Sequence, residues 1–350
     1  MKTYLVTGGA GFIGSNFIEY MLKKYSDIRI INIDKLTYAG NLENLKTVEN
    51  NKNYSFYEID ICDKESIEKI FAENNIDYVV NFAAESHVDR SIKEPEIFVR
   101  TNVLGTVNIL NSAKKAWETP VGFEEGKKFI QISTDEVYGS LEDTGYFTET
   151  TPLDPHSPYS SSKASADLMV KAYYDTYNMP INITRCSNNY GPYQFPEKLI
   201  PLIINNCINR KMLPIYGDGL NIRDWLYVED HCKAIEKVIK EGVIGQVYNI
   251  GGNNEKTNIY IVKTIIQYIN ENMDSKVTEK LIKYVEDRKG HDKRYAINAQ
   301  KIKEELGWVP ETTFELGIKK TIQWYIDNQK WMDKVTSGEY KNYYKNAYLD

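Results

Sequence analysis

Three consecutive polar residues, Thr134, Asp135 and Glu136, have side chains that could carry out acid–base chemistry. They follow an apolar run at residues 128–132 that predicts a buried strand, so they lie where a strand gives way to a loop. In open α/β sheets, ligands bind beside such carboxyl ends of strands. Two adjacent carboxyl groups can act as base and acid on neighbouring atoms of a substrate if their pKa values differ. The triplet therefore predicts a site of proton transfer.

A tyrosine and a lysine follow at the spacing of one helical turn. Tyr159 and Lys163 fall within residues 157–177, which predict a helix with Pro158 in its first turn, so both side chains lie on one face. The ordinary pKa of tyrosine is near 10, and lowering it to neutrality costs about 4 kcal/mol. One ammonium about 4 Å away supplies on the order of 4 kcal/mol at an effective dielectric constant of about 20. We therefore expect Tyr159 to act as a base and Lys163 to lower its pKa.

These side chains need a scaffold, and the first residues of the chain predict one. A strand at residues 2–7 leads into Gly8, Gly11 and Gly14, after which apolar residues recur with helical spacing. A strand, a glycine turn and a helix in this order are typical of a dinucleotide-binding unit. The pyrophosphate of the dinucleotide would rest on the helix N-terminus, where backbone N–H groups favour anions.

Acids at the ends of the next two strands support this prediction. Asp34 follows a strand at residues 28–33, at the distance from the glycine turn where an acid hydrogen-bonds the ribose hydroxyls of NAD and repels the 2′-phosphate of NADP. Asp60 and Ile61 follow a strand at residues 54–59 and are placed to meet the adenine edge. The sequence therefore predicts NAD as the cofactor.

Strands and helices continue to alternate along the chain. Further strands are expected at residues 78–82, 129–133, 181–185 and 246–250, and helices at residues 64–71, 96–115 and 157–177. Apolar strands separated by helices imply a doubly wound, parallel α/β sheet of Rossmann-like type. We expect residues 1–188, with about 221–250, to form the NAD-binding domain. A smaller α/β substrate domain would take up about 189–220 and 251–350, with helices at 259–269 and 314–326, a strand at 280–285 and a helical surface tail at 331–348.

Length and composition restrict the class of protein. The chain has 350 residues, of which 42% are hydrophobic and 26% charged, as is usual for a globular enzyme. Its net charge of −6 argues against nucleic-acid binding. No stretch approaches the about 18 apolar residues of a membrane span, and the N-terminus lacks the pattern of a signal peptide. Four scattered cysteines indicate reduced thiols without a metal site, so we expect a cytoplasmic protein.

Together these motifs resemble the extended short-chain dehydrogenase/reductase family. The positions that carry the resemblance are Gly8, Gly11, Gly14, Asp34, Asp60, residues 81–84, Tyr159 and Lys163. Segments at residues 84–91, 133–139 and 185–192 resemble, more specifically, the dTDP-glucose 4,6-dehydratases within that family. The segment at 133–139 is the specific part, because the glycine turn and the tyrosine–lysine pair are shared across the wider family.

The resemblance implies a reaction in three stages on dTDP-glucose. Tyr159 would take the proton of the 4-hydroxyl while a hydride leaves sugar carbon 4 for NAD, and Thr134 would hydrogen-bond the 4-oxygen. Glu136 would then remove the proton from carbon 5, and a protonated Asp135 would assist the departing 6-hydroxyl. Return of the hydride to carbon 6 gives a 4-keto-6-deoxy sugar. The residues alone leave open which of the two acids has which role.

The resemblance also implies binding residues and an assembly. The expected NAD contacts are Gly8, Gly11, Phe12, Ile13, Gly14, Asp34, Lys35, Asp60, Ile61, Phe82, Ala83, Ala84, Ser86, Thr101, Tyr159 and Lys163. The expected contacts to the nucleotide-diphosphate sugar are Ser86, Thr134, Asn189, Lys198, Leu199, Arg223, Asn258, Arg288, His291 and Tyr295. The arginines would supply bidentate contacts to the diphosphate. A homodimer would form through the helices at residues 96–115 and 157–177.

Three other functions fit part of the pattern. A nucleotide-sugar 4-epimerase shares the glycine turn, Tyr159 and Lys163, but has no use for the adjacent acids Asp135 and Glu136. A nucleotide-sugar decarboxylase also begins by oxidising carbon 4. A catalytically silent NAD-binding regulator could dispense with the tyrosine–lysine pair altogether. The two acids therefore favour a dehydratase.

Overall fold

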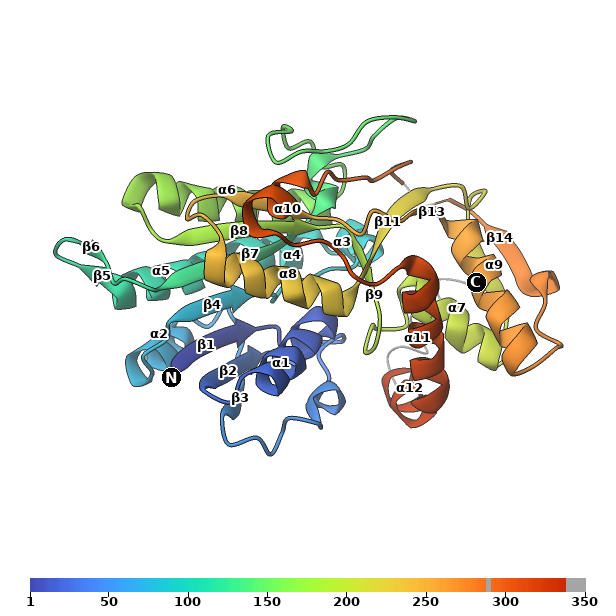
Figure 1. Ribbon diagram of the computed structural model, residues 1–350, viewed down its shortest axis with the longest axis horizontal. Helices are drawn as coiled ribbons and strands as arrows, with labels where there is room; N and C mark the ends of the chain where they lie inside the picture. Colours follow the sequence, from blue (N-terminus) through green and yellow to red (C-terminus); the bar gives the residue numbers. More distant parts are fainter. Residues whose placement is uncertain (288–290, 338–350) are drawn as a thin grey trace.

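The computed structural model describes residues 1–287 and 291–337, and its centre is a seven-stranded parallel sheet (Figure 1). The strands are β1 (Lys2–Thr7), β2 (Ile28–Asp34), β3 (Tyr54–Glu58), β4 (Tyr78–Asn81), β7 (Lys128–Thr134), β8 (Ile181–Cys186) and β12 (Val247–Ile250). Their order is β12-β8-β7-β4-β1-β2-β3, so the direction of winding reverses between β1 and β4. The predicted doubly wound α/β fold is confirmed, and a ligand crevice is expected at this reversal.

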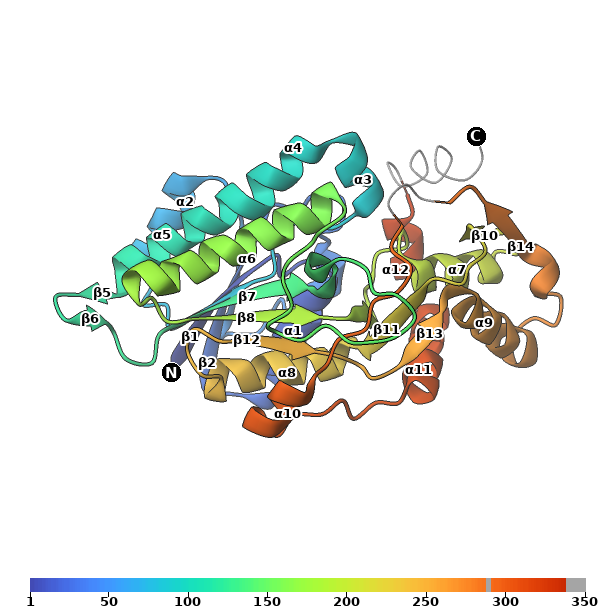
Figure 2. The same cartoon turned by 90° about the horizontal axis from the view of Figure 1, so that it is seen from above.

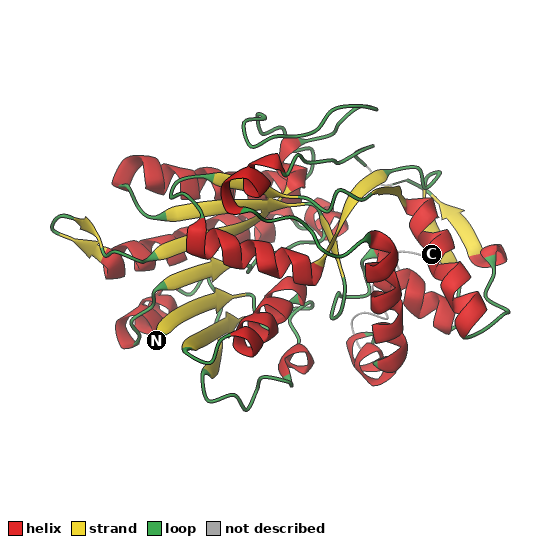
Figure 3. Cartoon of the chain, viewed as in Figure 1, coloured by secondary structure: helices red, strands yellow, loops and turns green. Residues whose placement is uncertain are grey.

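Helices cover both faces of the sheet (Figures 2 and 3). One face carries α1 (Phe12–Lys24), α8 (Val228–Glu241) and α10 (Gln300–Leu306), and the other carries α2 (Lys64–Glu73), α5 (Thr106–Trp117) and α6 (Pro158–Tyr177). Side chains alternate between the faces along each strand. In β1, for example, Tyr4 and Val6 pack against α1 and α8, whereas Leu5 packs against α2 and α5. Both cores are thus filled from one sheet.

The helix expected at residues 96–115 is divided into three parts. It comprises α4 (Pro95–Phe98), a π-helical segment at Val99–Gly105 and α5, and α3 (Val88–Lys93) precedes it. Wider turns of this kind often occur at functional sites. Here the π-helical turn carries Asn102, which is buried and bonds both backbone groups of Glu85, through Oδ1 at 2.8 Å and Nδ2 at 3.0 Å. A short hairpin, β5 (Glu118–Thr119) and β6 (Gly122–Phe123), follows α5.

A second core lies at the far end of the sheet, on the right of Figure 1. It is built on β9 (Asn188–Tyr190), β10 (Leu213–Tyr216), β11 (Ile222–Tyr227), β13 (Glu255–Thr257), β14 (Ile282–Val285), α7 (Leu199–Ile208), α9 (Asn258–Asn272), α11 (Phe314–Asp327) and α12 (Gln329–Val335). Helix α7 is not among the helices expected from the sequence, and it contains Pro201, a residue type that often marks a loop. That proline lies in the first turn of α7, where its missing N–H breaks no helical bond.

The C-terminal segment differs from the expected surface tail. Trp331, Met332 and Val335 in α12 are buried against the second core, and residues 338–350 lie outside the described residues. The division into two domains stays a prediction. Ile302 of α10 packs with the first core, although its position falls in the range expected for the substrate domain. Within the described ranges, we find no helix that is both long and apolar enough to cross a bilayer.

Candidate active site

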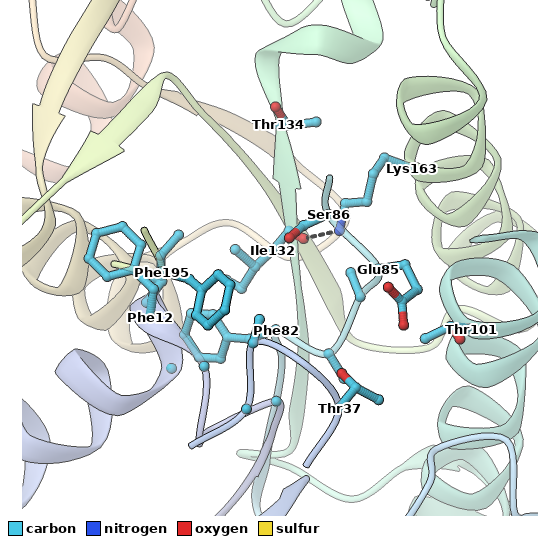
Figure 4. Close-up of a pocket in the computed structure, with 18 of the residues that line it drawn as sticks. Phe12, Thr37, Phe82, Glu85, Ser86, Thr101, Ile132, Thr134, Lys163 and Phe195 are labelled. Atoms are coloured by element: carbon cyan, nitrogen blue, oxygen red, sulfur yellow. Dashed lines mark hydrogen bonds between the residues drawn. The ribbon is translucent and has the colours of Figure 1, made fainter. Parts of the chain in front are cut away.

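A cavity of about 300 Å³ opens at the carboxyl ends of the central strands, where the strand order reverses (Figure 4). It is lined by all five residues predicted to be catalytic and by every residue predicted to contact the cofactor. The glycine turn after β1 forms one wall. The loop after β7 and the start of α6 form the opposite wall. The structure therefore brings the two predicted groups of residues into one space.

The glycine turn has a shape that only glycine permits at two positions. Gly8 has a φ of 67°, and a Cβ there would lie 2.6 Å from the backbone nitrogen of Ala83. A Cβ on Gly14 would lie 2.4 Å from the carbonyl oxygen of Gly8. Helix α1 begins after Gly11 without a side-chain cap, so the N–H groups of its first turn face the cavity region unpaired within the helix. This arrangement suits a pyrophosphate.

Acids end the neighbouring strands, as predicted. Asp34 is buried, and burial raises the pKa of its carboxyl group. Its two oxygens accept hydrogen bonds from the N–H groups of Ala10 at 3.0 Å and Leu36 at 2.8 Å. Each carboxylate oxygen can accept a second bond, so ribose hydroxyls could still be bound. Asp60 pairs with Lys35 at 2.7 Å on the same rim of the cavity.

The proposed acid–base triplet begins at the last residue of β7. The hydroxyl oxygen of Thr134 accepts a bond from the N–H of Glu136 at 3.3 Å, which starts the 3₁₀ turn Asp135–Tyr138. The same hydroxyl donates to Oδ1 of Asp135 at 3.3 Å. Asp135 is 1% exposed, and its Oδ2 is buried without a partner among the described residues. Burial, followed by the charges of Glu136 and Asp224, raises its pKa well above the ordinary value. Asp135 is therefore suited to hold a proton.

Tyr159 and Lys163 lie on the first turns of α6, whose start is fixed by a reciprocal capping box between Ser157 and Ser160. Lys163 donates from Nζ to the carbonyl oxygen of Ile132 at 2.6 Å, and burial lowers the pKa of its ammonium (Figure 4). The pKa of Tyr159 is raised well above its ordinary value by burial and next by the charge of Glu136. This direction is opposite to the one expected for Tyr159, and burial is its largest cause. The expected effect of Lys163 on this pKa stays a prediction.

A second cavity of about 170 Å³ adjoins the first and shares Glu136, Asn189 and Lys198 with it. Of the predicted sugar-nucleotide contacts, Asn189, Lys198, Leu199, Arg223, Asn258, His291 and Tyr295 line this second cavity. Ser86 and Thr134 line the first cavity, and Arg288 lies outside the described residues. The predicted substrate residues thus extend from the acids toward the second core.

Several of these side chains already make internal contacts. Arg223 donates to the carbonyl oxygens of Ile222 at 2.7 Å and Asp292 at 3.0 Å, and its guanidinium lies 4.3 Å from the centre of the Tyr295 ring. The amide oxygen of Asn189 bonds Nδ1 of His231 at 2.9 Å. These contacts hold the guanidinium of Arg223 in one orientation at the wall of the cavity.

Sequence reasoning missed other residues that line the cavities, notably Glu197 and Tyr216. The side chain of Glu197 is 1% exposed and lies 3.9 Å from Nε2 of His87 and 3.8 Å from Nε of Arg90. Burial raises its pKa to about 7, so it can change protonation state near neutrality. Its position directly before Lys198 was the one available signal. Among the described residues, no cluster of three or more His, Cys, Asp or Glu side chains is placed to hold a metal ion.

Comparison with known proteins gives a consistent result. The family described as GDP-mannose 4,6 dehydratase matches residues 5–321. The dTDP-glucose 4,6-dehydratase of Neisseria meningitidis serogroup B is 52% identical, over 97% of this chain and 98% of that protein. A crystal structure of dTDP-glucose 4,6-dehydratase from Bacillus anthracis in complex with NAD has a TM-score of 0.86 and 52% identity, covering 96% and 100% of the two chains. A Streptomyces venezuelae dTDP-glucose 4,6-dehydratase, also with NAD bound, has a TM-score of 0.88 and 42% identity, covering 95% and 99%.

The agreement extends across both cores and the cavities between them. The family match covers the glycine turn, the acid triplet and the tyrosine–lysine pair in one continuous stretch. Identity of about half over nearly the whole length lies far above the level at which only the fold would be shared. The chain belongs to the nucleotide-sugar 4,6-dehydratase family, with the dTDP-glucose 4,6-dehydratases as its relatives.

Proposed function

We propose that the chain is a hydro-lyase that converts dTDP-glucose to dTDP-4-keto-6-deoxyglucose with NAD as its cofactor. The observation that carries this proposal is the meeting of Asp135, Glu136 and Tyr159 in one cavity opposite the glycine turn. Tyr159, as the base for the 4-hydroxyl, is then close to the carboxyl groups of Asp135 and Glu136, which can remove water across carbons 5 and 6. No simpler oxidation or epimerisation needs all three groups.

The walls of the first cavity fit NAD. The first turn of α1 would hold the pyrophosphate, Asp34 the ribose hydroxyls and Asp60 the adenine edge, and Gly8 and Gly14 leave the backbone close enough for contact. When bound, NAD would accept the hydride of carbon 4 and give it back to carbon 6, while Glu136 returns the proton it holds to carbon 5. In our proposal residues 1–188 and about 221–250 bind the cofactor, and the rest of the chain binds the sugar nucleotide.

Tyr159 starts the reaction by removing the proton of the 4-hydroxyl as carbon 4 is oxidised. Burial and the carboxylate of Glu136 raise the pKa of the phenol, so Tyr159 must first lose its own proton, which the positive charges of Lys163 and of an oxidised nicotinamide would favour. Thr134, whose hydroxyl lies at the end of β7, would turn its O–H from Asp135 to the 4-oxygen when the sugar binds and keep that oxygen beside Tyr159. The product of this step is a ketone at carbon 4.

Elimination follows because the ketone acidifies the hydrogen on carbon 5. Glu136 accepts that proton, the electron pair forms the bond between carbons 5 and 6, and the carbon 6–oxygen bond breaks. Asp135 gives its proton to the departing hydroxyl, which leaves as water. The raised pKa of Asp135 supports this assignment, since the acid must be protonated when the hydroxyl leaves.

The second cavity would hold the nucleoside diphosphate. Helix α7 starts at Leu199 without a side-chain cap, and Lys198 and Arg223 add positive charge beside it. These groups suit a diphosphate. The rings of Tyr216, His291 and Tyr295 line the remaining surface and offer flat contacts for the base.

The experiment is to incubate the purified protein with the dTDP, UDP, CDP and GDP derivatives of glucose and to identify the products by NMR. We expect a 4-keto-6-deoxy sugar from dTDP-glucose and no net rise in the absorbance of reduced nicotinamide, because the hydride returns to the product. A 4-epimer would show a nucleotide-sugar epimerase instead, whereas a decarboxylase would leave all four glucose derivatives without a shortened product, because they carry no carboxyl group to lose. A steady rise in reduced nicotinamide would show an ordinary dehydrogenase.

We propose that two copies of the chain associate through α4, the π-helical segment and α6. These elements expose large apolar side chains, including Val99 at 53%, Leu104 at 56% and Leu168 at 60%, and they lie along one side of the molecule (Figure 2). Leu168→Glu should shift the species seen by analytical ultracentrifugation from dimer to monomer. Leu316→Glu, at an exposed leucine of α11, is the matched control. Equal behaviour of both variants would contradict this interface.

We also propose a cytoplasmic location. All four cysteines are free thiols, with Cys186, Cys207 and Cys232 buried and Cys62 partly exposed. Unpaired thiols are typical of reducing compartments, where disulfides do not persist. Fractionation of the native cells with an antibody against the chain would test the location, and recovery of the chain outside the cytoplasmic fraction would contradict it.

A further inference from the structure

Ala10, at the centre of the glycine turn, is held by three hydrogen bonds. Its N–H donates to Oδ2 of Asp34 at 3.0 Å. Its carbonyl oxygen accepts from the N–H of Asn41 at 3.0 Å and from Nδ2 of Asn44 at 2.9 Å. The N–H on the other side of the same peptide, that of Gly11, donates to the carbonyl of Gly8 at 3.2 Å. The orientation of the Ala10–Gly11 peptide is therefore fixed from both ends.

Asn44 connects this peptide to the C-terminal helix. Its side chain is 1% exposed, and its Oδ1 accepts a bond from Nε1 of Trp331 at 2.7 Å, across 287 positions of the chain. The indole nitrogen can donate but cannot accept. The indole and the Ala10 carbonyl, which can only accept, together hold the Asn44 amide with its oxygen toward Trp331 and its NH₂ group toward Ala10. Without the indole N–H, the amide loses one of these two partners, and only the carbonyl of Ala10 is left to position it.

The position of Trp331 is itself determined by packing. The indole is buried in α12 and contacts the rings of Trp324, Tyr325 and Tyr193, with centroids 5.2, 6.0 and 6.2 Å away. The hydroxyl of Tyr325 donates to the carbonyl of Gln194 at 2.8 Å, and Gln194 lines the first cavity. The C-terminal helices thus support the cavity from two directions, through the glycine turn and through the loop after β9.

We propose that Trp331 is a positioning residue for the cofactor, acting through Asn44 on Ala10, so that α12 holds the glycine turn in its NAD-binding shape. This inference rests on the proposed binding of NAD. It extends the function of the second core, which thereby contributes to retaining the cofactor as well as to binding the sugar nucleotide. The hydrogen bonds from Trp331 through Asn44 to Ala10 form what we call the relay. An ion pair between Lys334 and Glu43 at 2.9 Å lies beside it. Because this pair is partly exposed to solvent, we expect it to add little to the stability of the glycine turn.

The test compares two tryptophan variants of the holoenzyme. Trp331→Phe keeps a ring in the cluster but removes the N–H, and the loss of one partner of a buried hydrogen bond predicts about a tenfold faster release of NAD. Trp324→Phe shortens the neighbouring indole in the same cluster and lies outside the relay, so its release rate should stay within about twofold of the wild type. The measurement is exchange of bound NAD against labelled NAD, together with the NAD content per subunit after purification. At saturating NAD, kcat of Trp331→Phe should match the wild type.

A second variant keeps the test decisive. Asn44→Ala breaks the same relay from the other end, and in a double variant with Trp331→Phe the effects should not add, because both act on one path. If Trp331→Phe does not fold, Asn44→Ala alone decides the question. Wild-type release rates in Asn44→Ala, or equal rates in the two tryptophan variants, would overturn the proposal. A wild-type protein that binds NAD but forms no keto sugar would refute the dehydratase function and leave the relay testable.

Discussion

Replacing Asp135 by asparagine tests the assignment of the catalytic acid most directly. Asparagine has the same shape and keeps a hydrogen-bond donor, but it cannot release a proton near neutrality. In the structure this carboxyl is 1% exposed, and burial, followed by the charges of Glu136 and Asp224, raises its pKa well above the ordinary value. We therefore expect the substitution to exchange one neutral group for another at neutral pH, so that the chemistry changes and the fold does not.

The substitution should slow the loss of water but should not lower the free energy of unfolding at pH 7. General acids contribute about 10²- to 10⁴-fold, so loss of water should slow by about 3–5 kcal/mol in activation free energy. For stability, the pKa of the folded state lies above the unfolded value of about 3.9. The wild type therefore loses stability as the pH rises from about 4 to the pKa that Asp135 has in the folded state. Asp135→Asn lacks that loss, so its free energy of unfolding at pH 7 should equal or exceed that of the wild type.

The assay is a single turnover of dTDP-glucose in deuterium oxide, with urea unfolding at pH 4 and pH 7 alongside. Asp135→Asn should still oxidise carbon 4 and exchange the carbon-5 hydrogen, while the 4-keto-6-deoxy product forms slowly. Dehydration within about threefold of the wild type would refute the role of Asp135 as the acid. A variant less stable than the wild type at pH 7 would show that the carboxyl is ionised and paired, which contradicts the reasoning from burial.

Two further predictions concern the partner acid and the frame of the sheet. Glu136→Gln should abolish exchange of the carbon-5 hydrogen with solvent, measured by NMR, while oxidation at carbon 4 persists, and exchange at the wild-type rate would exclude Glu136 as the base. Lys128 donates to the carbonyls of Val238 at 3.1 Å and Gly242 at 2.9 Å at the end of α8, and burial lowers its pKa to about 8. Because the unfolded value is higher, the wild type should gain about 3 kcal/mol as pH rises from about 8 to 10.5. Lys128→Met should lack this gain in urea unfolding, and parallel pH profiles would contradict the buried charge.

The parts of the fold that the sequence predicts well depend on neighbours along the chain. Gly8 and Gly14 identify the turn because each needs a backbone approach that a Cβ would block, at 2.6 and 2.4 Å. Asp34 and Asp135 identify strand ends because an acid stands at or shortly after the end of a buried strand. In each case the residues that determine the local structure are the same few neighbouring residues that form the sequence pattern.

The parts that could not be predicted depend on partners far away in sequence. Arg223 has the right type for a phosphate contact, but the carbonyl of Asp292, on another segment, determines its orientation. Trp331 belongs to a polar stretch that suggests a surface, whereas its indole is buried among the rings of Trp324, Tyr325 and Tyr193 and donates to Asn44. Local composition carries no information about such a partner. The environment of Tyr159 is a similar case, since burial and then the charge of Glu136, on another element, raise its pKa instead of lowering it.

The raised pKa of Tyr159 has a consequence for the order of events. Burial and then the charge of Glu136 favour the protonated phenol, so Tyr159 can accept the proton of the 4-hydroxyl only after it has lost its own. In the proposed mechanism two positive charges near the phenol would favour its ionisation, the ammonium of Lys163 and the oxidised nicotinamide of bound NAD. We therefore expect the binding of oxidised NAD to lower the pKa of Tyr159, so that the cofactor that accepts the hydride also helps to produce the base.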